Sequence, residues 1–561
     1  MKTPRILLWL SLSLVLFPWY RGAQADVTLI SRGEARTAIY VPATLRGSGA
    51  PTGTVDRRRL RASIDDLAHY LKRMSGAAVD VVAGMPSVGD TRVPILIGDL
   101  AAQRFGPPET HAPAAQGFRI DVTSEAIGLQ GESDLSTSYA IYELLDQQGC
   151  RWYMPSAMGE VIPKRTTIQV REQTLDTAPF TVMRSIWHAD EDYRRRNRLG
   201  GLELSTHHAL EGYITPKLLE EHPEWRAVGA DGEHHGRRLK FSQPGVAEAI
   251  AAHLIRVLDE NPNRRTVSLS PDDGPATGWG FDTTADRQLD AADWDATMPG
   301  VSHTDRLVWF CNRIAERVTA KHPDITFGML AYRSYNRPPV REKLHPSIVP
   351  QIAPLSYSRA HPWTDVGEPN NETMRYIVRG WAQAAARVSF YLYGYFWPEL
   401  STPNPFITKW SVNVPIVLKE GKCKFWQPET LPNFDTTLHA LYLGIRLSWN
   451  PDQKPADILE ELHRLFYGNA SAEMAAYWHF IDECWVETPE YSGGGYGHLR
   501  RFPRDRMDRA RQLMDTALAA AKTSEEAFRV RMADESLRLF ELFMKIKSSE
   551  VIIAFGKNDQ H

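Results

Sequence analysis

The sequence predicts an α/β protein whose central unit is a (β/α)8 barrel of the TIM type. A chain of 561 residues is too long for one ordinary core, so two or three domains are expected. Between residues 180 and 455, short β-like runs alternate with helical stretches, which is typical of such a barrel. Only helical patterns follow. The predicted divisions are a signal peptide (1–25), an N-terminal α/β accessory domain (27–175), the barrel (180–455) and a C-terminal helical region (456–561).

The N-terminal division reads as a small mixed domain. The stretch 63–76 has apolar spacing typical of a helix and ends at Gly76. A continuous apolar run at 93–99 predicts a buried strand, and 117–131 predicts a hairpin. A helix is expected within 134–155, capped near Asp134 or Ser136 and stopped by Gly149. The run 159–170 predicts a second pair of strands.

The barrel division contains eight candidate strands with helices between them. The expected strands are 181–187, 201–205, 238–242, 266–271, 325–332, 349–355, 388–396 and 422–427. The expected helices are 244–259, 303–321, 371–386, 404–410 and 433–447. Beyond residue 455 four further helical stretches are expected to pack on the barrel.

The composition excludes some classes of protein. Contents of 43% hydrophobic and 24% charged residues are ordinary for a globular protein. The net charge is only −3, and the basic block Arg194–Arg195–Arg196 is short, so nucleic acid is not an expected partner. The unusual feature is 16 Trp and 20 Tyr, whose rings suit either a large core or stacking on sugars.

The first 25 residues predict a secretory signal peptide. Lys2 and Arg5 precede an apolar run, and Ala23-Gln24-Ala25 is a small-x-small cleavage site. The run is short for a transmembrane span, and no other run of about 18 apolar residues occurs. We therefore expect an exported protein, periplasmic or extracellular, with no membrane association after cleavage. An uncleaved anchor is the alternative.

No motif predicts a metal or a cofactor. The cysteines Cys150, Cys311, Cys423 and Cys484 lie far apart and form no CxxC or Cys/His pattern, although one or two disulfides are possible. The doublets His207–His208 and His234–His235 lack the spacing of zinc ligands. The sequence also contains no serine nucleophile elbow, P-loop or dinucleotide fingerprint.

Polar and aromatic residues follow the predicted strands at the end where barrel enzymes place their sites. These candidate substrate-binding residues are Trp187, His188, His207, His208, Trp279, Tyr332, Arg333, Tyr357, Tyr395, Trp397, Glu399, Trp426 and Glu429. Such a gathering favours a carbohydrate cleft, although any single Trp can equally pack in the core.

The pair Asp272–Asp273 ends the predicted strand 266–271. Alternation along this strand places Ser268, Ser270 and Asp272 on one face, which suits a barrel lumen, and leaves Asp273 at the mouth. Repulsion between the two carboxylates tends to raise one pKa, so that one can be an acid while the other stays ionised. An Asx turn, a helix N-cap and a Ca²⁺ site are the other interpretations of the pair.

Several stretches resemble known families. The stretch from 65 to 155 resembles the accessory domain of bacterial α-glucuronidases and hexosaminidases. The pieces "HPEW", "FSQPGVAEAIAAHL", "VSLSPDDG" and "FYLYGYF" resemble a bacterial group long classed as a domain of unknown function, of the DUF4838 type. Part of that group is classed as glycoside hydrolase family 163, which includes endo-β-N-acetylglucosaminidases that act on N-glycans.

This resemblance implies a retaining, substrate-assisted mechanism, in which the 2-acetamido oxygen of the substrate attacks the anomeric carbon. By the same resemblance, Asp272 would orient the acetamido group and Asp273 would be the acid/base. Two alternatives remain open. One is an α-glucuronidase-like or other glycosidase with separated carboxylates, where Glu399 or Glu429 acts with Asp273 and Arg333 binds a substrate carboxylate. The other is a non-catalytic glycan-binding protein.

Overall fold

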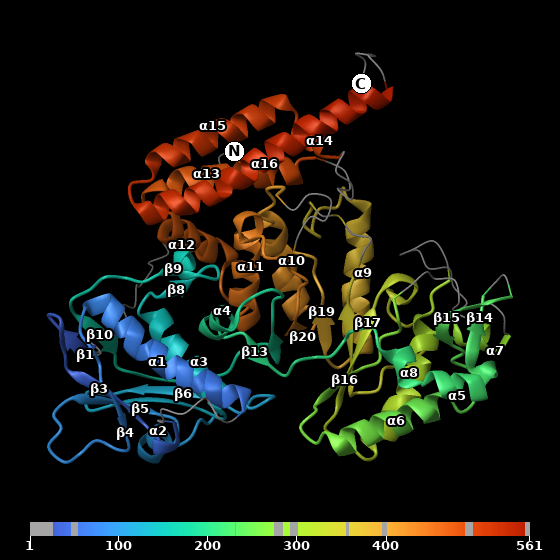
Figure 1. Ribbon diagram of the computed structural model, residues 1–561, viewed down its shortest axis with the longest axis horizontal. Coiled ribbons are helices and arrows are strands. Elements are labelled where there is room, and N and C mark those ends of the chain that lie inside the picture. Colours follow the sequence, from blue (N-terminus) through green and yellow to red (C-terminus); the bar gives the residue numbers. More distant parts are fainter. Residues whose placement is uncertain are drawn as a thin grey trace, which may run out of the picture.

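The computed structural model describes residues 26–45, 54–229, 232–273, 284–291, 301–354, 358, 360–394, 401–488 and 497–555. The N-terminal α/β part lies at the lower left of Figure 1, the central sheet with its helices in the middle and right, and the C-terminal helices along the top. One large hydrophobic cluster fills the N-terminal part, and a second runs through both the central and the C-terminal parts. The C-terminal helices therefore share a core with the central sheet.

The N-terminal part is built on a six-stranded sheet with helices on both faces. Its strands, in spatial order, are β11 (Gln173–Thr177), β6 (Phe118–Val122), β7 (Ile127–Gly131), β5 (Val93–Ile97), β3 (Thr37–Val41) and β4 (Val81–Ala83). The strands from β7 to β4 are parallel, whereas β6 and β11 are antiparallel to their neighbours. Helices α1 (Val55–Ser75) and α3 (Asp134–Gln147) cover one face, and α2 (Asp99–Phe105) covers the other.

Local capping sets the ends of the two long helices. The Thr54 side chain accepts a hydrogen bond from the Arg57 amide at the start of α1, and Gly76 ends the helix in the left-handed region at φ 83°. Helix α3 starts with a capping box between Ser133 and Ser136, one residue before the predicted cap.

The predicted pairing of strands within 159–170 is wrong. Strand β9 (Glu160–Val161) pairs with β8 (Arg151–Trp152). Strand β10 (Ile168–Arg171) pairs with β1 (Asp26–Ser31), which also pairs with β2 (Glu34–Ala35). The physical reason is that alternation identifies a strand but carries no information on its partner.

A curled seven-stranded sheet forms the centre of the molecule. Its strands, in spatial order, are β13 (Gly200–Gly201), β12 (Met183–Arg184), β20 (Cys423–Trp426), β19 (Val388–Phe390), β18 (Ile348–Ile352), β17 (Thr326–Ala331) and β16 (Thr266–Ser268). All are parallel except β13. Its associated helices are α6 (Val246–Glu260), α8 (Thr304–Thr319), α9 (Pro369–Ala384), α10 (Ile407–Lys419) and α11 (Phe434–Trp449).

A closed eight-stranded barrel is not confirmed. Of the predicted strand 201–205, only Gly201 belongs to a strand, in β13, which runs antiparallel to β12. The predicted strand 238–242 overlaps β15 (His234–Leu239), which pairs with β14 (Arg226–Val228) in a separate two-stranded sheet at the right of Figure 1. The described residues therefore form a half-barrel sheet rather than a full ring of eight strands.

An irregular segment, residues 202–209, bridges the two edges of this sheet. The amide of Leu202 donates to the Val182 carbonyl beside β12 at 3.2 Å, and the amide of Ala209 donates to the Ser270 carbonyl beyond β16 at 3.0 Å. The segment also crosses the inner face of β17, because a Cβ on Gly328 would lie 2.1 Å from the Ser205 carbonyl oxygen. A glycine is therefore required at position 328.

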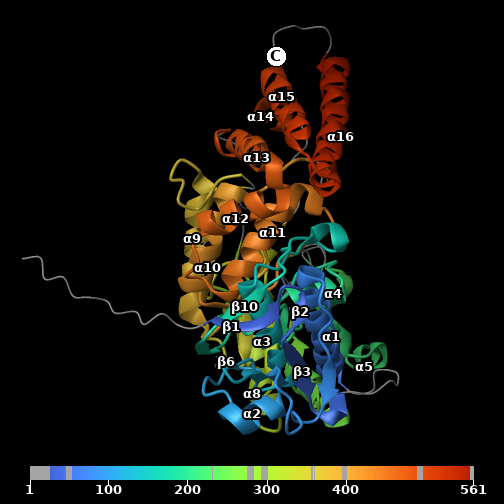
Figure 2. The ribbon, with the colours of Figure 1, turned by 90° about the vertical axis from the view of Figure 1, so that its left-hand side faces the viewer.

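The described residues of the C-terminal part contain five α-helices: α12 (Pro455–Tyr467), α13 (Ser471–Val486), α14 (Gly497–Arg501), α15 (Arg504–Ala520) and α16 (Ser524–Phe555). Figure 2 shows α15 and α16 standing side by side above the rest of the molecule. None of the described helices combines the length and apolarity needed to span a membrane. All four cysteines are buried and unpaired.

Candidate functional site

Six of the predicted site residues follow the C-terminal ends of parallel strands, an edge that we call the carboxyl edge. Asp272 and Asp273 follow β16, Tyr332 and Arg333 follow β17, and Trp187 and His188 follow β12. Because parallel strands end at the same side of a sheet, these residues share one end of the molecule's central sheet.

The alternation predicted for β16 is present, but its small polar residues serve the backbone. Val267 and Leu269 lie in the hydrophobic core behind the sheet. On the other face, the Ser268 hydroxyl donates to the His207 carbonyl at 2.5 Å, and the Ser270 hydroxyl donates to the Thr206 carbonyl at 2.8 Å. The two serines therefore hold the bridging segment 202–209 against the strand.

Asp272 is anchored through its backbone by a buried carboxylate. Its amide donates a hydrogen bond of 2.6 Å to Oε2 of Glu211, which lies in the short helix η3 (Leu210–Tyr213). The other oxygen of Glu211 lies 3.0 Å from Nη1 of Arg238. Burial raises the pKa of Glu211, while Arg238 acts in the opposite direction. The half-buried Asp272 is thus fixed at the end of β16.

Asp273 reaches further out and faces a guanidinium group. Its side chain is 54% exposed, and Oδ1 lies 3.7 Å from Nε of Arg333, which is itself 44% exposed. Arg333 adopts a left-handed backbone conformation at φ 48°, and its guanidinium lies 5.2 Å from the ring centroid of Tyr332. The carboxyl edge therefore presents one carboxylate and one cation close together at the surface.

The two neighbouring histidines have different surroundings. Nδ1 of His208 lies 2.5 Å from the Pro271 carbonyl, and its ring centroid lies 6.2 Å from that of Tyr332. His207 instead contacts the Ser205 hydroxyl at 3.0 Å. Within the described ranges, no three His, Cys, Asp or Glu side chains come together in a group that could hold a metal ion.

A second group of predicted residues lies beyond β12 and β20. The Trp187 ring, 39% exposed, lies 5.7 Å from the ring of Tyr391, and the Trp187 carbonyl accepts a hydrogen bond from the Thr430 hydroxyl. His188 is exposed and left-handed at φ 55°. A cavity of about 380 Å³ adjoins them, with a lining that includes Ser185, Trp187, His188, Arg194, Glu203 and Gln427.

Glu429 is half-buried at the same edge. Its amide donates to the Leu392 carbonyl at 2.9 Å, and its carbonyl accepts the Gly394 amide at 2.8 Å. These bonds extend the pairing of β19 and β20 beyond the strands themselves.

Trp426 does not line a cleft, so its prediction as a sugar-binding residue is wrong. The side chain is 1% exposed and lies edge-on to Trp410 of α10, with ring centroids 5.7 Å apart. It also lies close to Gly444 of α11. Trp426 therefore packs between the sheet and its helices, where the lack of a side chain at position 444 makes room for the ring.

Five other predicted residues, Trp279, Tyr357, Tyr395, Trp397 and Glu399, lie outside the described residues. Conversely, the structure adds Glu211, Arg238 and Tyr391 to the carboxyl edge. Glu211 lies 61 positions before Asp272 in a turn without regular periodicity, so no pattern in the sequence connects the two residues.

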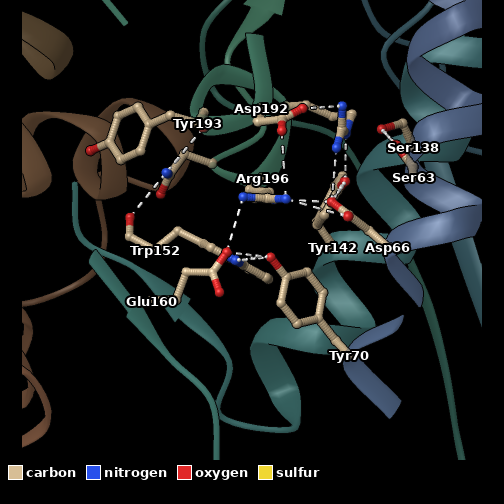
Figure 3. A network of polar contacts seen from close by, with 12 residues as sticks. Ser63, Asp66, Tyr70, Ser138, Tyr142, Trp152, Glu160, Asp192, Tyr193 and Arg196 are labelled. Carbon is tan, nitrogen blue, oxygen red and sulfur yellow. Dashed lines mark hydrogen bonds and ion pairs between the residues drawn. The ribbon is translucent and has the colours of Figure 1, made fainter. Parts of the chain in front are cut away.

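A buried polar network fixes the segment that follows Trp187 and His188. Helix α4 (Glu191–Arg196) carries the basic block, and Nε of Arg196 lies 3.0 Å from Asp66 of α1, while Nη1 lies 3.0 Å from Glu160 (Figure 3). Arg195 also pairs with Asp66, at 2.9 Å. Burial opposes ionisation of Asp66, but Arg196 and Arg195 hold its pKa below the usual value. The basic block therefore has a structural role.

The arrangement resembles solved structures of carbohydrate-active enzymes. The GH115 4-O-methyl-α-glucuronidase BtGH115A aligns with a TM-score of 0.54 and 12% identity over 91% of this chain and 73% of that chain. Weaker likenesses are a GH138 enzyme that targets pectin rhamnogalacturonan II (TM-score 0.47, 9% identity, 93% and 89% coverage), and the GH20 β-N-acetylhexosaminidase of Streptomyces coelicolor A3(2) (TM-score 0.41, 12% identity, 81% and 93% coverage). The first likeness shows a shared fold.

Membership of a family follows from the sequence itself. Residues 154–479, more than half of the chain, match the model of a domain of unknown function, DUF4838. The protein therefore belongs to the DUF4838 family. No curated protein matches the chain.

Proposed function

We propose that this protein is a glycoside hydrolase that acts on glycans containing N-acetylhexosamine, in the manner of an endo-β-N-acetylglucosaminidase. The observation that carries the proposal is the adjacent pair Asp272–Asp273 at the carboxyl edge, with one residue anchored and the other exposed. The fold shared with a glycosidase supports it. So does the presence of aromatic side chains at the same edge, of which Trp187 and Tyr332 are at least partly exposed.

The two aspartates have environments suited to different tasks. Asp272 is half-buried and its backbone is held by Glu211, so its carboxylate could keep a fixed position toward the N–H of a 2-acetamido group. Asp273 is exposed and could reach the oxygen of the leaving group as general acid. In a substrate-assisted, retaining reaction the acetamido oxygen would attack the anomeric carbon, so that no nucleophile from the protein is needed.

Arg333 favours a second candidate, a glycosidase for uronic acid substrates. Its guanidinium lies 3.7 Å from Asp273 and is 44% exposed, so the carboxylate of a uronic acid could replace Asp273 as its partner. In that reaction Asp273 would act with a separated carboxylate such as Glu429. A non-catalytic glycan-binding protein would keep the Asp273–Arg333 pair intact and bind without turnover.

The test uses the full chain with an N-glycopeptide, an aryl N-acetyl-β-glucosaminide, the matching aryl β-glucoside and an aryl α-glucuronide. We expect release of sugar from the first two classes only, and Asp273→Asn should lower turnover by about two to four orders of magnitude. Asp272→Ala should lower the turnover of substrates with an acetamido group by a similar factor. The exposed Asp508→Asn on α15 is the matched control and should be fully active.

Full activity of Asp273→Asn would rule out its role as the acid. Hydrolysis of the glucuronide alone, abolished by Arg333→Ala, would favour the second candidate. Binding of glycans with no turnover of any substrate would favour the non-catalytic alternative.

A further inference from the structure

A cavity with four cations lies at the opposite end of the central sheet from the carboxyl edge. Its volume is about 450 Å³, and it is lined by residues that precede the strands: Val182 precedes β12, Arg387 precedes β19, and Lys422 precedes β20. Residues of the N-terminal part, among them Pro113, complete the wall. The length of the strands therefore separates the cavity from the aspartate pair.

The charged residues of this wall all have the same sign. Arg387, Lys419, Lys422 and Lys424 line it, and none of the described residues in its wall is acidic. Lys419 has an external partner, because its Nζ lies 2.7 Å from the exposed Asp452. Lys424 donates a hydrogen bond to the Phe180 carbonyl at 3.0 Å and lies 3.5 Å from the centroid of the Phe180 ring.

Arg387 and Lys422 have no such compensation: in the part of the chain that the structure describes, neither has a carboxylate within ion-pair distance. Arg387 is half-buried, and its guanidinium lies 5.7 Å from the centroid of the buried Phe425 ring. Burial lowers the pKa of both Arg387 and Lys424. A guanidinium does not deprotonate near neutral pH, so a bound anion would offset the hydration that Arg387 has lost.

Apart from Gln116 and Thr181, the remaining wall is apolar. Phe180, Pro179, Pro113 and Leu418 provide it, and the space is larger than a bare inorganic anion needs. A ligand that matches both features has an anionic group for Arg387 and Lys422 and a compact body for the apolar surface.

We propose that this cavity, the basic pocket, binds an acidic sugar residue that carries a carboxylate or a sulfate ester. That the compact body is a sugar rests on the proposed function, whereas the anionic group follows from the pocket itself. The pocket would hold a glycan away from the carboxyl edge, as a non-catalytic subsite.

The experiment is isothermal titration of the full chain at low ionic strength with glucuronate, glucose 6-sulfate, glucose and inorganic sulfate. We expect binding of one or both acidic sugars, weaker or no binding of glucose and sulfate, and weakening by added salt. Arg387→Ala should reduce the affinity about ten- to hundredfold, since it removes charge-assisted hydrogen bonds. Lys422→Ala, at an exposed position, is the second variant, and the exposed Lys217→Ala on α5 (Pro216–Glu221) is the matched control.

The outcomes separate the pocket from the catalytic proposal, because titration needs no turnover. Binding that is lost in Arg387→Ala and kept in Asp273→Asn supports the pocket, whether or not the protein hydrolyses any glycan. Comparing the affinities of glucuronate and glucose 6-sulfate shows which acidic group the pocket prefers. Equal affinity of Arg387→Ala and wild type, equal binding of glucose or of inorganic sulfate, or loss of binding only in Arg333→Ala would each overturn the proposal.

Discussion

The backbone amide of Asp272 donates a 2.6 Å hydrogen bond to the buried carboxylate of Glu211, so the position of one proposed catalytic residue depends on a side chain that faces away from solvent. Glu211→Gln keeps the shape and an acceptor oxygen but removes the charge that faces Arg238. Breaking a buried charge pair costs about 3–5 kcal/mol of unfolding free energy. We expect a loss of that order in urea denaturation, together with lower turnover.

The exposed Glu220→Gln on α5 is the control for this substitution and should change neither quantity. Unchanged stability of Glu211→Gln would mean that the buried pair with Arg238 contributes little and that Asp272 is held by other contacts.

Gly328 tests the bridging segment. A methyl group at this position would lie 2.1 Å from the Ser205 carbonyl oxygen, and backbone cannot move aside as a flexible side chain can. We therefore expect Gly328→Ala to lower the unfolding free energy by at least ~1–3 kcal/mol, the usual range for overpacking. In Gly212→Ala the new methyl group meets no atom within 4 Å, so thermal unfolding of this variant should match wild type. Equal stabilities of the two variants would contradict the path described for residues 202–209.

A buried pair of histidines predicts loss of stability in acid. Nε2 of His439 in α11 lies 3.0 Å from Nε2 of His463 in α12, an arrangement that two protonated rings cannot keep, because neither then has an acceptor nitrogen. Burial lowers the pKa of His463 from 6.5 to about 4 and also lowers that of His439 well below 6.5. Between pH 6.5 and about 4 the unfolded chain binds more protons than the folded one. The contribution of the neutral histidine to the unfolding free energy is therefore fully present above pH 6.5 and is lost as the pH falls toward 4.

Each such histidine contributes a slope of about 1.4 kcal/mol per pH unit within that window. His463→Gln should make the dependence of the unfolding free energy on pH shallower by roughly one proton, as measured by urea denaturation at several pH values. The exposed His69→Gln on α1 should leave the slope as it is. A slope that His463→Gln does not change would show that other groups carry the acid sensitivity.

Two tryptophans at the ends of neighbouring strands should behave in opposite ways. Trp187 is 39% exposed, so Trp187→Ala should weaken glycan binding to the Asp273→Asn variant by ~1–3 kcal/mol if the ring stacks on a sugar, a magnitude borrowed from stacking of bases on aromatic rings. Trp426 is fully packed, so Trp426→Ala should instead cost ~3–5 kcal/mol of unfolding free energy. Calorimetric titration and thermal unfolding separate the two effects, and unchanged glycan affinity in Trp187→Ala would leave that ring without a binding role.

The sequence predicted the parallel strands well where a run was apolar and bounded by turns. The runs around β17 and β18 are of this kind, because strands covered on both faces need largely apolar residues. The runs 201–205 and 238–242 have the alternation of a strand, but alternation does not specify whether the partner is a central sheet or a two-stranded ribbon. Helix α10 continues to Lys419, well past the predicted end at 410, despite Pro415 within it.

The candidate site was predictable only in part, for similar reasons. The sequence predicted that Asp272 and Asp273 follow a strand, and they do follow β16, although that strand ends at Ser268 rather than at 271. The sequence did not predict the role of Glu211, because its contact with Asp272 is set by the path of residues 202–209. Trp426 was predicted to bind sugar because it stands at the end of a strand, but it belongs to β20 itself and is buried in the core.

The ion pairs between α4 and the first helix also bear on how this protein can be divided. A fragment cut to residues 154–479, the family match, would discard Asp66 and leave Arg195 and Arg196 with two of their carboxylate partners at most, Glu160 and Asp192. It would also remove α15 and α16, which contribute Met514 and Phe540 to the shared core. The smallest fragment worth expressing is therefore larger than the family match. If the N-terminal α/β part were exchanged between relatives, the carboxylates that pair with Arg195 and Arg196 would have to be kept as well.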